Sequence, residues 1–207
     1  MPRVAVIDFE TTGLSPAMGD RATEVAIVLM EGVQVVDRFQ SLMNAGVRIP
    51  PFIEQYTGIS NDMIRAAPPA SDVMAQARRF VGGVPLVAHN ASFDQRFWQA
   101  ELARLGPDDG AAAPFACTML LSRRLYPQVG SYRLQSLASF HALPSAGRAH
   151  RAMADAEVAS ALLSRIREDI RRDYSVEAAP HSLLVKLQRT QRKALPKAID
   201  SFLAARG

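Results

Sequence analysis

The chain has 207 residues and a formal net charge of +4, and 48% of its residues are hydrophobic, which fits one domain with a sizeable core. No run of residues is long and apolar enough to span a membrane, and Met1-Pro2-Arg3 leads directly into an expected strand, which excludes a signal peptide. The single cysteine, Cys117, excludes an internal disulfide and fits a reducing cytoplasm, so we expect a small buried residue there.

The first part of the chain is predicted to form strands and then helices. The expected elements are strands over Val4–Phe9, Glu24–Met30 and Val33–Leu42, short helical turns over Phe52–Ile64, and a helix over Asp72–Val81. A tight turn at Glu31-Gly32 would join the second and third strands. Ser71 is the expected N-cap of the helix, which would end at Gly82-Gly83.

The second part of the chain alternates strands and helices. The expected elements are strands over Pro85–His89 and Phe115–Thr118, and helices over Ser92–Leu105, Leu120–Leu125, Leu134–Leu143 and Arg151–Arg172. Asp108–Ala113 is expected to form a loop, and Asp173–Pro180 a linker. A hairpin meander followed by alternating helices and strands favours an α/β domain with a mixed sheet.

Two acidic residues end the first expected strand. Because strand residues alternate between faces, Asp8 and Glu10 should point the same way. Two neighbouring carboxylates repel each other, and a divalent cation would offset that cost. The pair therefore predicts a metal site.

Two further acidic motifs follow in order along the chain. They are His-Asn-x-x-Phe-Asp at residues 89–94 and His-x-x-x-x-Asp at residues 150–155, after Asp-x-Glu-Thr-Thr-Gly at residues 8–13. With these motifs the chain resembles the DnaQ-like 3′–5′ exonucleases, within them the DEDDh branch, which includes the proofreading epsilon subunit of bacterial DNA polymerase III. The resemblance runs from about Val4 to Leu163. It implies a ribonuclease H-like fold, a mixed five-stranded sheet flanked by helices, and an exonuclease domain over residues 1–172.

The resemblance also implies the chemistry of the site. Four carboxylates would hold two Mg²⁺ or Mn²⁺ ions, which prefer oxygen ligands. Asp8 would be shared by both ions, Glu10 and Asp155 would complete the first site, and Asp94 would be the fourth ligand. His150 would be the general base that takes a proton from the attacking water. The alternative for each aspartate is a helix cap or a surface charge, and for His150 a solvated loop histidine.

Several residues are candidates for binding the 3′-terminal nucleotide. Gly13 would let the backbone approach the substrate, Thr12 could bond the sugar, and Leu14 could wedge against the base. Phe93 could support the sugar or base, or could be a core aromatic. The full candidate set comprises Thr11, Thr12, Gly13, Leu14, Asn90 and Phe93. His89 is expected to position its neighbours. In Tyr56-Thr57-Gly58-Ile59 a threonine stands where related exonucleases often have histidine, which leaves base contacts from this segment open.

The expected function is hydrolysis of phosphodiester bonds at single-stranded or frayed DNA 3′ ends, releasing nucleoside 5′-monophosphates. The alternatives are an exoribonuclease on short or structured RNA, since the motifs do not separate the two substrates, and a non-catalytic subunit of a DNA polymerase.

The last part of the chain, residues 173–207, is expected to be a basic helical tail. From residue 165 onward there are 10 basic residues and 5 acidic ones, whereas residues 1–164 have 14 and 15. The cations could attract a polyanion or form a solvated helix face. An apolar patch at Leu183, Leu184 and Leu187, and a last helix starting near Pro196, could fold back on the domain or dock on a partner.

Overall fold

The computed structural model describes residues 3–106, 114–144 and 150–205, which form a central sheet covered by helices on both faces. The sheet has five strands in the order β3-β2-β1-β4-β5. Strands β1 (Arg3–Thr11), β2 (Ala22–Glu31) and β3 (Gln34–Leu42) are antiparallel neighbours, whereas β4 (Leu86–Ala88) and β5 (Ala116–Cys117) continue the sheet in parallel with β1. This arrangement confirms the expected mixed five-stranded sheet.

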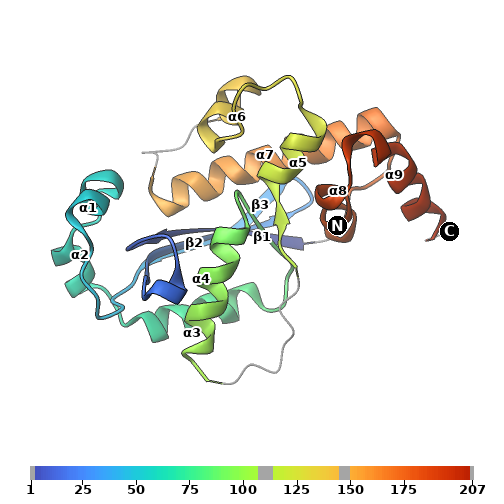
Figure 1. Ribbon diagram of the computed structural model, residues 1–207. Coiled ribbons are helices and arrows are strands. Elements are labelled where there is room, and N and C mark those ends of the chain that lie inside the picture. Colours follow the sequence, from blue (N-terminus) through green and yellow to red (C-terminus); the bar gives the residue numbers. More distant parts are fainter. Residues whose placement is uncertain (1–2, 107–113, 145–149, 206–207) are drawn as a thin grey trace.

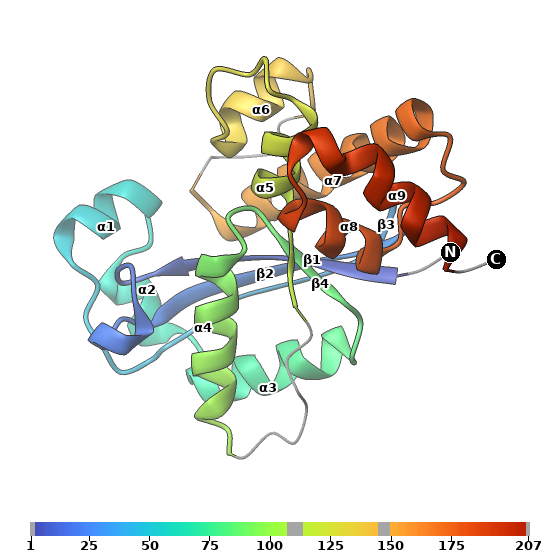
Figure 2. The ribbon, with the colours of Figure 1, turned by 45° about the vertical axis from the view of Figure 1, so that its right-hand side comes forward.

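The helices lie in two layers. Figures 1 and 2 show α3 and α4 on one face of the sheet and α5, α7, α8 and α9 on the other. The helices are η1 (Pro16–Met18), α1 (Pro51–Thr57), α2 (Asn61–Ala66), α3 (Ala70–Val81), α4 (Ser92–Ala103), α5 (Thr118–Leu125), α6 (Leu134–Phe140), α7 (Ala152–Tyr174), α8 (His181–Arg189), η2 (Arg192–Ala194) and α9 (Leu195–Ala204). Within the described residues, no helix has both the length and the apolar character needed to cross a bilayer.

Strand β1 is buried on both faces, and its alternation fixes where the acidic pair points. Val4 and Val6 belong to the core beneath α7, whereas Ile7 and Phe9 belong to the core against α3 and α4. Because successive strand residues face opposite sides, Asp8 and Glu10 continue the face of Val4 and Val6. Both carboxylates are thereby directed to the α7 side of the sheet.

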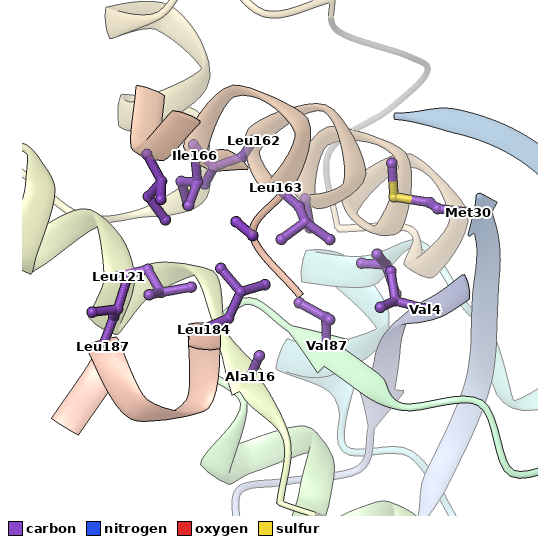
Figure 3. Close-up of a cluster of buried hydrophobic side chains, with 14 of the residues drawn as sticks. Val4, Met30, Val87, Ala116, Leu121, Leu162, Leu163, Ile166, Leu184 and Leu187 are labelled. Carbon is purple, nitrogen blue, oxygen red and sulfur yellow. The ribbon is translucent and has the colours of Figure 1, made fainter. Parts of the chain in front are cut away.

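Helix α7 approaches the sheet closely through small residues at its start. Ala152 and Ala156 are fully buried, and Ala159 is nearly so. Further along, Leu162, Leu163 and Ile166 pack against strand residues such as Val4 and Val87 (Figure 3). The small residues bring the first turn of α7, which carries Asp155, to the carboxyl end of β1.

The last helices belong to the same core. Leu183, Leu184, Leu187, Leu195 and Ile199 are buried in the cluster that contains Val4 and residues of α7. Figure 3 shows Leu184 and Leu187 in this cluster. Of the two alternatives for this segment, the structure shows folding back on the domain for α8 and α9. The division into residues 1–172 and 173–207 stays a prediction.

One side chain of α8 completes the outer edge of the sheet. Gln188 is buried, its Oε1 accepts from the backbone N–H of Cys117 at 2.6 Å, and its Nε2 donates to the carbonyl of Phe115 at 3.0 Å. The side-chain amide thus bonds the exposed edge of β5 as a neighbouring strand would. Cys117 itself is buried and free, as expected.

Some sequence-based boundaries were wrong. Ser71 does not cap α3, because the helix already begins at Ala70 with Pro69 as its N-cap. The backbone N–H of Ala70 donates to the carbonyl of Asn44 at 2.9 Å, which fixes the chain one residue before Ser71. Helix α6 ends at Phe140 rather than Leu143. The expected loop Asp108–Ala113 lies outside the described residues.

Candidate active site

Three of the predicted acidic residues meet at the carboxyl end of β1. Asp8, Glu10 and Asp155 each present an oxygen atom, and these atoms lie within 4.8 Å of one another. Asp8 and Glu10 come from the same face of β1, and Asp155 comes from the first turn of α7. Three carboxylate oxygens at this spacing are a donor set for a hard divalent cation.

Asp94 joins the group from the other side of the strand. It lies in the first turn of α4, is 2% exposed, and its Oδ1 accepts from the backbone N–H of Phe9 at 3.2 Å. Phe9 lies between Asp8 and Glu10, so this bond places Asp94 directly beside the acidic pair. The four acidic residues expected at one site are therefore neighbours.

The pKa values of the carboxyl groups show how crowded they are. Burial, followed by repulsion from Asp94, Glu10 and Asp155, raises the pKa of Asp8 well above its ordinary value. Burial and repulsion from Asp155 and Glu24 raise the pKa of Glu10 to about 8. The pKa values of Asp94 and Asp155 are also raised, mainly by burial. Without a cation, this cluster carries several carboxyl groups whose ionisation is opposed by their surroundings.

His150 lies at the mouth of the cluster, next to Asp155. Its backbone N–H donates to Oδ2 of Asp155 at 2.9 Å, and its φ of 63° is in the left-handed region, which is uncommon for a residue other than glycine. The imidazole stacks on the ring of Tyr56 from α1, with 4.0 Å between ring centroids. Tyr56 was not among the expected site residues, although the sequence analysis singled out its segment. The neighbouring Thr57 is buried and bonds its own helix.

The start of α7 is held by a buried carboxylate that the sequence analysis did not identify. Glu24 on β2 is 1% exposed and accepts from Arg151 at 2.9 and 3.1 Å, from the backbone N–H of Ala152 at 3.1 Å, and from Gln40 at 2.8 Å. Burial alone would raise the pKa of Glu24, but these hydrogen bonds hold it below its ordinary value. Arg151 lies between His150 and α7, so the ion pair fixes the segment that carries His150 and Asp155.

Asp155 has a second partner from α6. Gln135 donates from Nε2 to Oδ1 of Asp155 at 3.1 Å. Both oxygens of this carboxylate therefore accept a hydrogen bond, one from Gln135 and one from the backbone of His150. These contacts orient the carboxylate toward Asp8 and Glu10.

The segment after β1 forms a tight loop beside the carboxylates. Thr11 donates to the carbonyl of Gly13 at 2.6 Å, and Thr12 accepts from the backbone N–H of Arg21 at 3.0 Å. A Cβ at Gly13 would collide with the carboxylate of Asp20, which accepts from the backbone N–H of Ser15 at 2.9 Å, so a larger residue would displace this side chain from its place in the loop. Leu14 is 79% exposed. The loop thus holds an apolar side chain in the open beside the site.

The other expected substrate-binding residues differ in their surroundings. Asn90 is exposed, with φ 61°. Phe93 is partly buried and packs on Phe97 at 4.9 Å, so its ring belongs largely to the core. His89 connects two walls of the site, since one ring nitrogen contacts Thr118 Oγ1 at 2.9 Å and Nε2 donates to the carbonyl of Tyr132 at 3.0 Å. Burial lowers the pKa of His89 to about 4, which keeps the ring neutral.

Some of these residues line one open cleft of about 1020 Å³, whereas Glu10, Asp94, Phe93 and the Thr11–Leu14 loop are not part of its lining. Its acidic end holds Asp8 and Asp155 with His150, and its other wall comes from α5, the 126–133 loop and α6. The lining residues of that wall include Met119, Arg123, Tyr132, Arg133 and Gln135. An extended polymer end could enter this cleft and reach the carboxylates.

Known proteins share this sequence pattern and fold. The RNase T exonuclease family, described as Exonuclease, matches residues 5–163. The 3′-5′ exonuclease DinG of Bacillus subtilis is 36% identical over 207 residues, which cover 97% of this chain and 21% of DinG. A PolC-type DNA polymerase III of the same organism is 36% identical over 164 residues, 79% of this chain and 11% of the polymerase. The chain therefore spans only about a fifth or less of the length of these relatives.

Solved structures agree with this assignment. Exonuclease X in complex with 5′ overhanging duplex DNA aligns with a TM-score of 0.67 and 27% identity over 87% of this chain and 98% of that one. E. coli Exonuclease I in complex with a dT13 oligonucleotide aligns with a TM-score of 0.72 over 84% of this chain and 43% of that one, and its 19% identity supports the fold alone. The fold, the order of the acidic motifs and the family match lead to one conclusion: the chain belongs to the RNase T exonuclease family, the DnaQ-like 3′–5′ exonucleases.

Proposed function

We propose that this domain is a metal-dependent 3′–5′ exonuclease that releases nucleoside 5′-monophosphates from single-stranded or frayed DNA 3′ ends. The observation that carries the proposal is the meeting of Asp8, Glu10 and Asp155 within 4.8 Å, with the buried Asp94 beside them. Family membership supports the reaction class.

The donor set fits Mg²⁺ or Mn²⁺. All four side chains offer oxygen, which these hard cations prefer, and the raised pKa of Glu10, about 8, reflects crowding that positive charge would relieve. We propose that two ions would be held here by Asp8, Glu10, Asp155 and Asp94. Two such ions would stabilise the charge that develops on the phosphate and on the leaving oxygen.

The protein residues would supply position and proton transfer. His150 takes a proton from the attacking water, and the ring of Tyr56 and the backbone bond to Asp155 hold it at the cleft mouth. Thr12 and the exposed Leu14 contact the terminal sugar and base, with Thr11 and Gly13 shaping their loop. Asn90 and the edge of Phe93 contact the same nucleotide from the start of α4.

The partner and substrate also belong to this proposal. The DinG and PolC relatives carry the matching region as a small part of a longer chain, which supports association with a larger DNA-processing protein such as a polymerase. We propose DNA as the preferred substrate, because exonuclease X, at 27% identity, is described in complex with 5′ overhanging duplex DNA.

One experiment tests the proposal directly. The purified protein is incubated with matched DNA and RNA strands labelled at the 3′ or the 5′ end, in Mg²⁺, Mn²⁺ or EDTA. We expect a 3′ label to be released as a mononucleotide at once and a 5′-labelled strand to shorten stepwise, only with metal. Faster cleavage of RNA would change the substrate, and no cleavage of any strand would refute the enzymatic function.

A further inference from the structure

Two long segments of this chain contain no acidic residue, and the catalytic site does not explain this distribution of charge. There is no aspartate or glutamate between Asp109 and Asp155, or between Glu177 and Asp200. The first of these acid-free segments contains α5, the 126–133 loop and α6, and the second contains α8 and η2. Both segments carry arginines or lysines without any local acidic partner.

The fold brings the two acid-free segments together. Helix α5 lies beside α8 in Figures 1 and 2, and Arg124 on α5 donates to the backbone carbonyl of Gln188 on α8 at 3.4 Å. Each helix has basic residues in its last turn, Arg123 and Arg124 on α5, and Lys186 and Arg189 on α8. The end of α8 is therefore joined to the helix that forms one wall of the catalytic cleft.

The basic residues of this region are available to a ligand. Arg123, Arg133 and Arg189 are exposed, and none of them forms an ion pair within the described parts of the chain. Other arginines are engaged by a carboxylate, namely Arg21 by Glu101 and Arg151 by Glu24. An arginine without a carboxylate partner keeps its donors free for a phosphate.

Two of these arginines line the same cleft as the carboxylates. Arg123 and Arg133 share it with Asp8 and His150, and the guanidinium of Arg123 lies 5.7 Å from the centre of the Tyr132 ring. Arginines next to an aromatic ring are typical of surfaces that hold single strands, because phosphates meet the cations and bases stack on the ring. The positive wall is opposite in charge to the acidic end where the scissile phosphate would lie.

We propose that Arg123, Arg133 and Arg189 form a phosphate-binding face for the part of a single strand upstream of its 3′ end. The inference rests on the proposed exonuclease function, because that function places the 3′ end of the strand at the carboxylates. From there the strand would run past α5 to the end of α8. Contacts to phosphates carry no base information, so binding along this face is independent of sequence. The face makes cleavage efficiency depend on strand length and on salt.

The test measures binding and cleavage in the same variants. Binding of a fluorescent oligothymidylate in EDTA is followed by anisotropy over a range of salt concentrations, for wild type, Arg123→Gln, Arg189→Gln and the double variant. Each lost phosphate contact should flatten the slope of log K against log salt by about 0.7. Arg79→Gln, on α3 at the opposite face of the sheet, removes the same charge and should leave the slope unchanged.

Cleavage supplies the second measurement. The KM for a long oligonucleotide should rise more than the KM for a trinucleotide in the double variant, and Arg123→Lys should keep the wild-type salt slope. A double variant with the wild-type slope would overturn the proposal and leave these arginines as stabilisers of helix ends, which a lower melting temperature would show. If the wild type cleaves no strand, the proposed function is wrong. The salt slopes of binding would still show whether Arg123 and Arg189 contact phosphates.

Discussion

The ion pair between Glu24 and Arg151 provides the sharpest prediction about the catalytic segment. In Glu24→Gln the side chain keeps its shape but offers one acceptor oxygen and an NH₂ group to the four donors that now surround the carboxylate. Two of those donors would then face the NH₂ group. The start of α7 would then no longer be held to β2. Because His150 and Asp155 lie directly beside this point, their positions would shift.

The expected loss of unfolding free energy in Glu24→Gln follows from the burial of this carboxylate. Breaking a buried ion pair costs about 3–5 kcal/mol, and hydrogen bonds to a charged group contribute about 1.5–3 kcal/mol each. The Arg151 side chain is 33% exposed and regains water, so we expect the lower end, about 3 kcal/mol of unfolding free energy. A displacement of His150 and Asp155 by about 1 Å can cost up to about 10²-fold in kcat.

The assay compares two buried ion pairs of the same design. Glu101 is 3% exposed and accepts from Arg21 at 2.8 and 2.8 Å and from the backbone N–H of Ala22 at 3.2 Å, but it does not contact the His150 segment. Urea unfolding should show similar losses for Glu24→Gln and Glu101→Gln. The kcat, measured where both variants are fully folded, should fall further for Glu24→Gln. Equal kcat losses in the two variants would refute a specific positioning role for Glu24.

Four further predictions concern metal binding, proton transfer, the pH dependence of stability and the core. Asp8→Ala should abolish cleavage while binding of single-stranded DNA in EDTA persists, because phosphate contacts elsewhere supply much of the affinity; near-normal turnover in Mg²⁺ would contradict the metal assignment. His150→Ala should lower kcat by at least about 10²-fold with metal binding kept, which a Mn²⁺ titration checks. A carboxyl group whose pKa is raised in the folded state stabilises the protein at low pH and loses that contribution as pH rises through its folded pKa, about 8 for Glu10. Therefore, in EDTA, wild type should lose melting temperature as pH rises from about 4.5 to about 8, more than Glu10→Gln does, and Mn²⁺ should restore it at the upper end of this range; parallel curves would count against this account. Leu187→Ala should cost about 2–5 kcal/mol in urea unfolding, because this fully packed residue joins α8 to the core.

The sequence predicted the parts of this protein that are encoded locally. Alternation along β1 predicted that Asp8 and Glu10 share one face, and the pattern of residues 151–172 predicted the helix that carries Asp155; both expectations are confirmed. Metal, general-base and substrate-binding roles remain predictions, although the structure brings the acidic residues and His150 together.

The contacts that sequence reasoning missed join residues that are far apart along the chain. Glu24 and Arg151 are separated by 127 positions, and nothing near either residue signals the pairing. The sequence around Tyr56 predicts only an exposed residue of a short helix. Its contact with His150 depends on the position of α1 beyond the end of the sheet. Ser71 failed as an N-cap because a backbone bond from Ala70 to Asn44, rather than local propensity, sets the start of α3.

The amide of Gln188 has a practical consequence for dividing this protein into fragments. A fragment trimmed to residues 5–163, where the family match ends, would retain all four acidic residues and His150. It would lack Gln188 and leave the N–H of Cys117 and the carbonyl of Phe115 on an open strand edge, beside apolar surface that α8 covers in the intact chain. Uncovered strand edges pair with other chains. Such a fragment would fail by self-association rather than by loss of chemistry, and insoluble protein would not be evidence against the catalytic assignment.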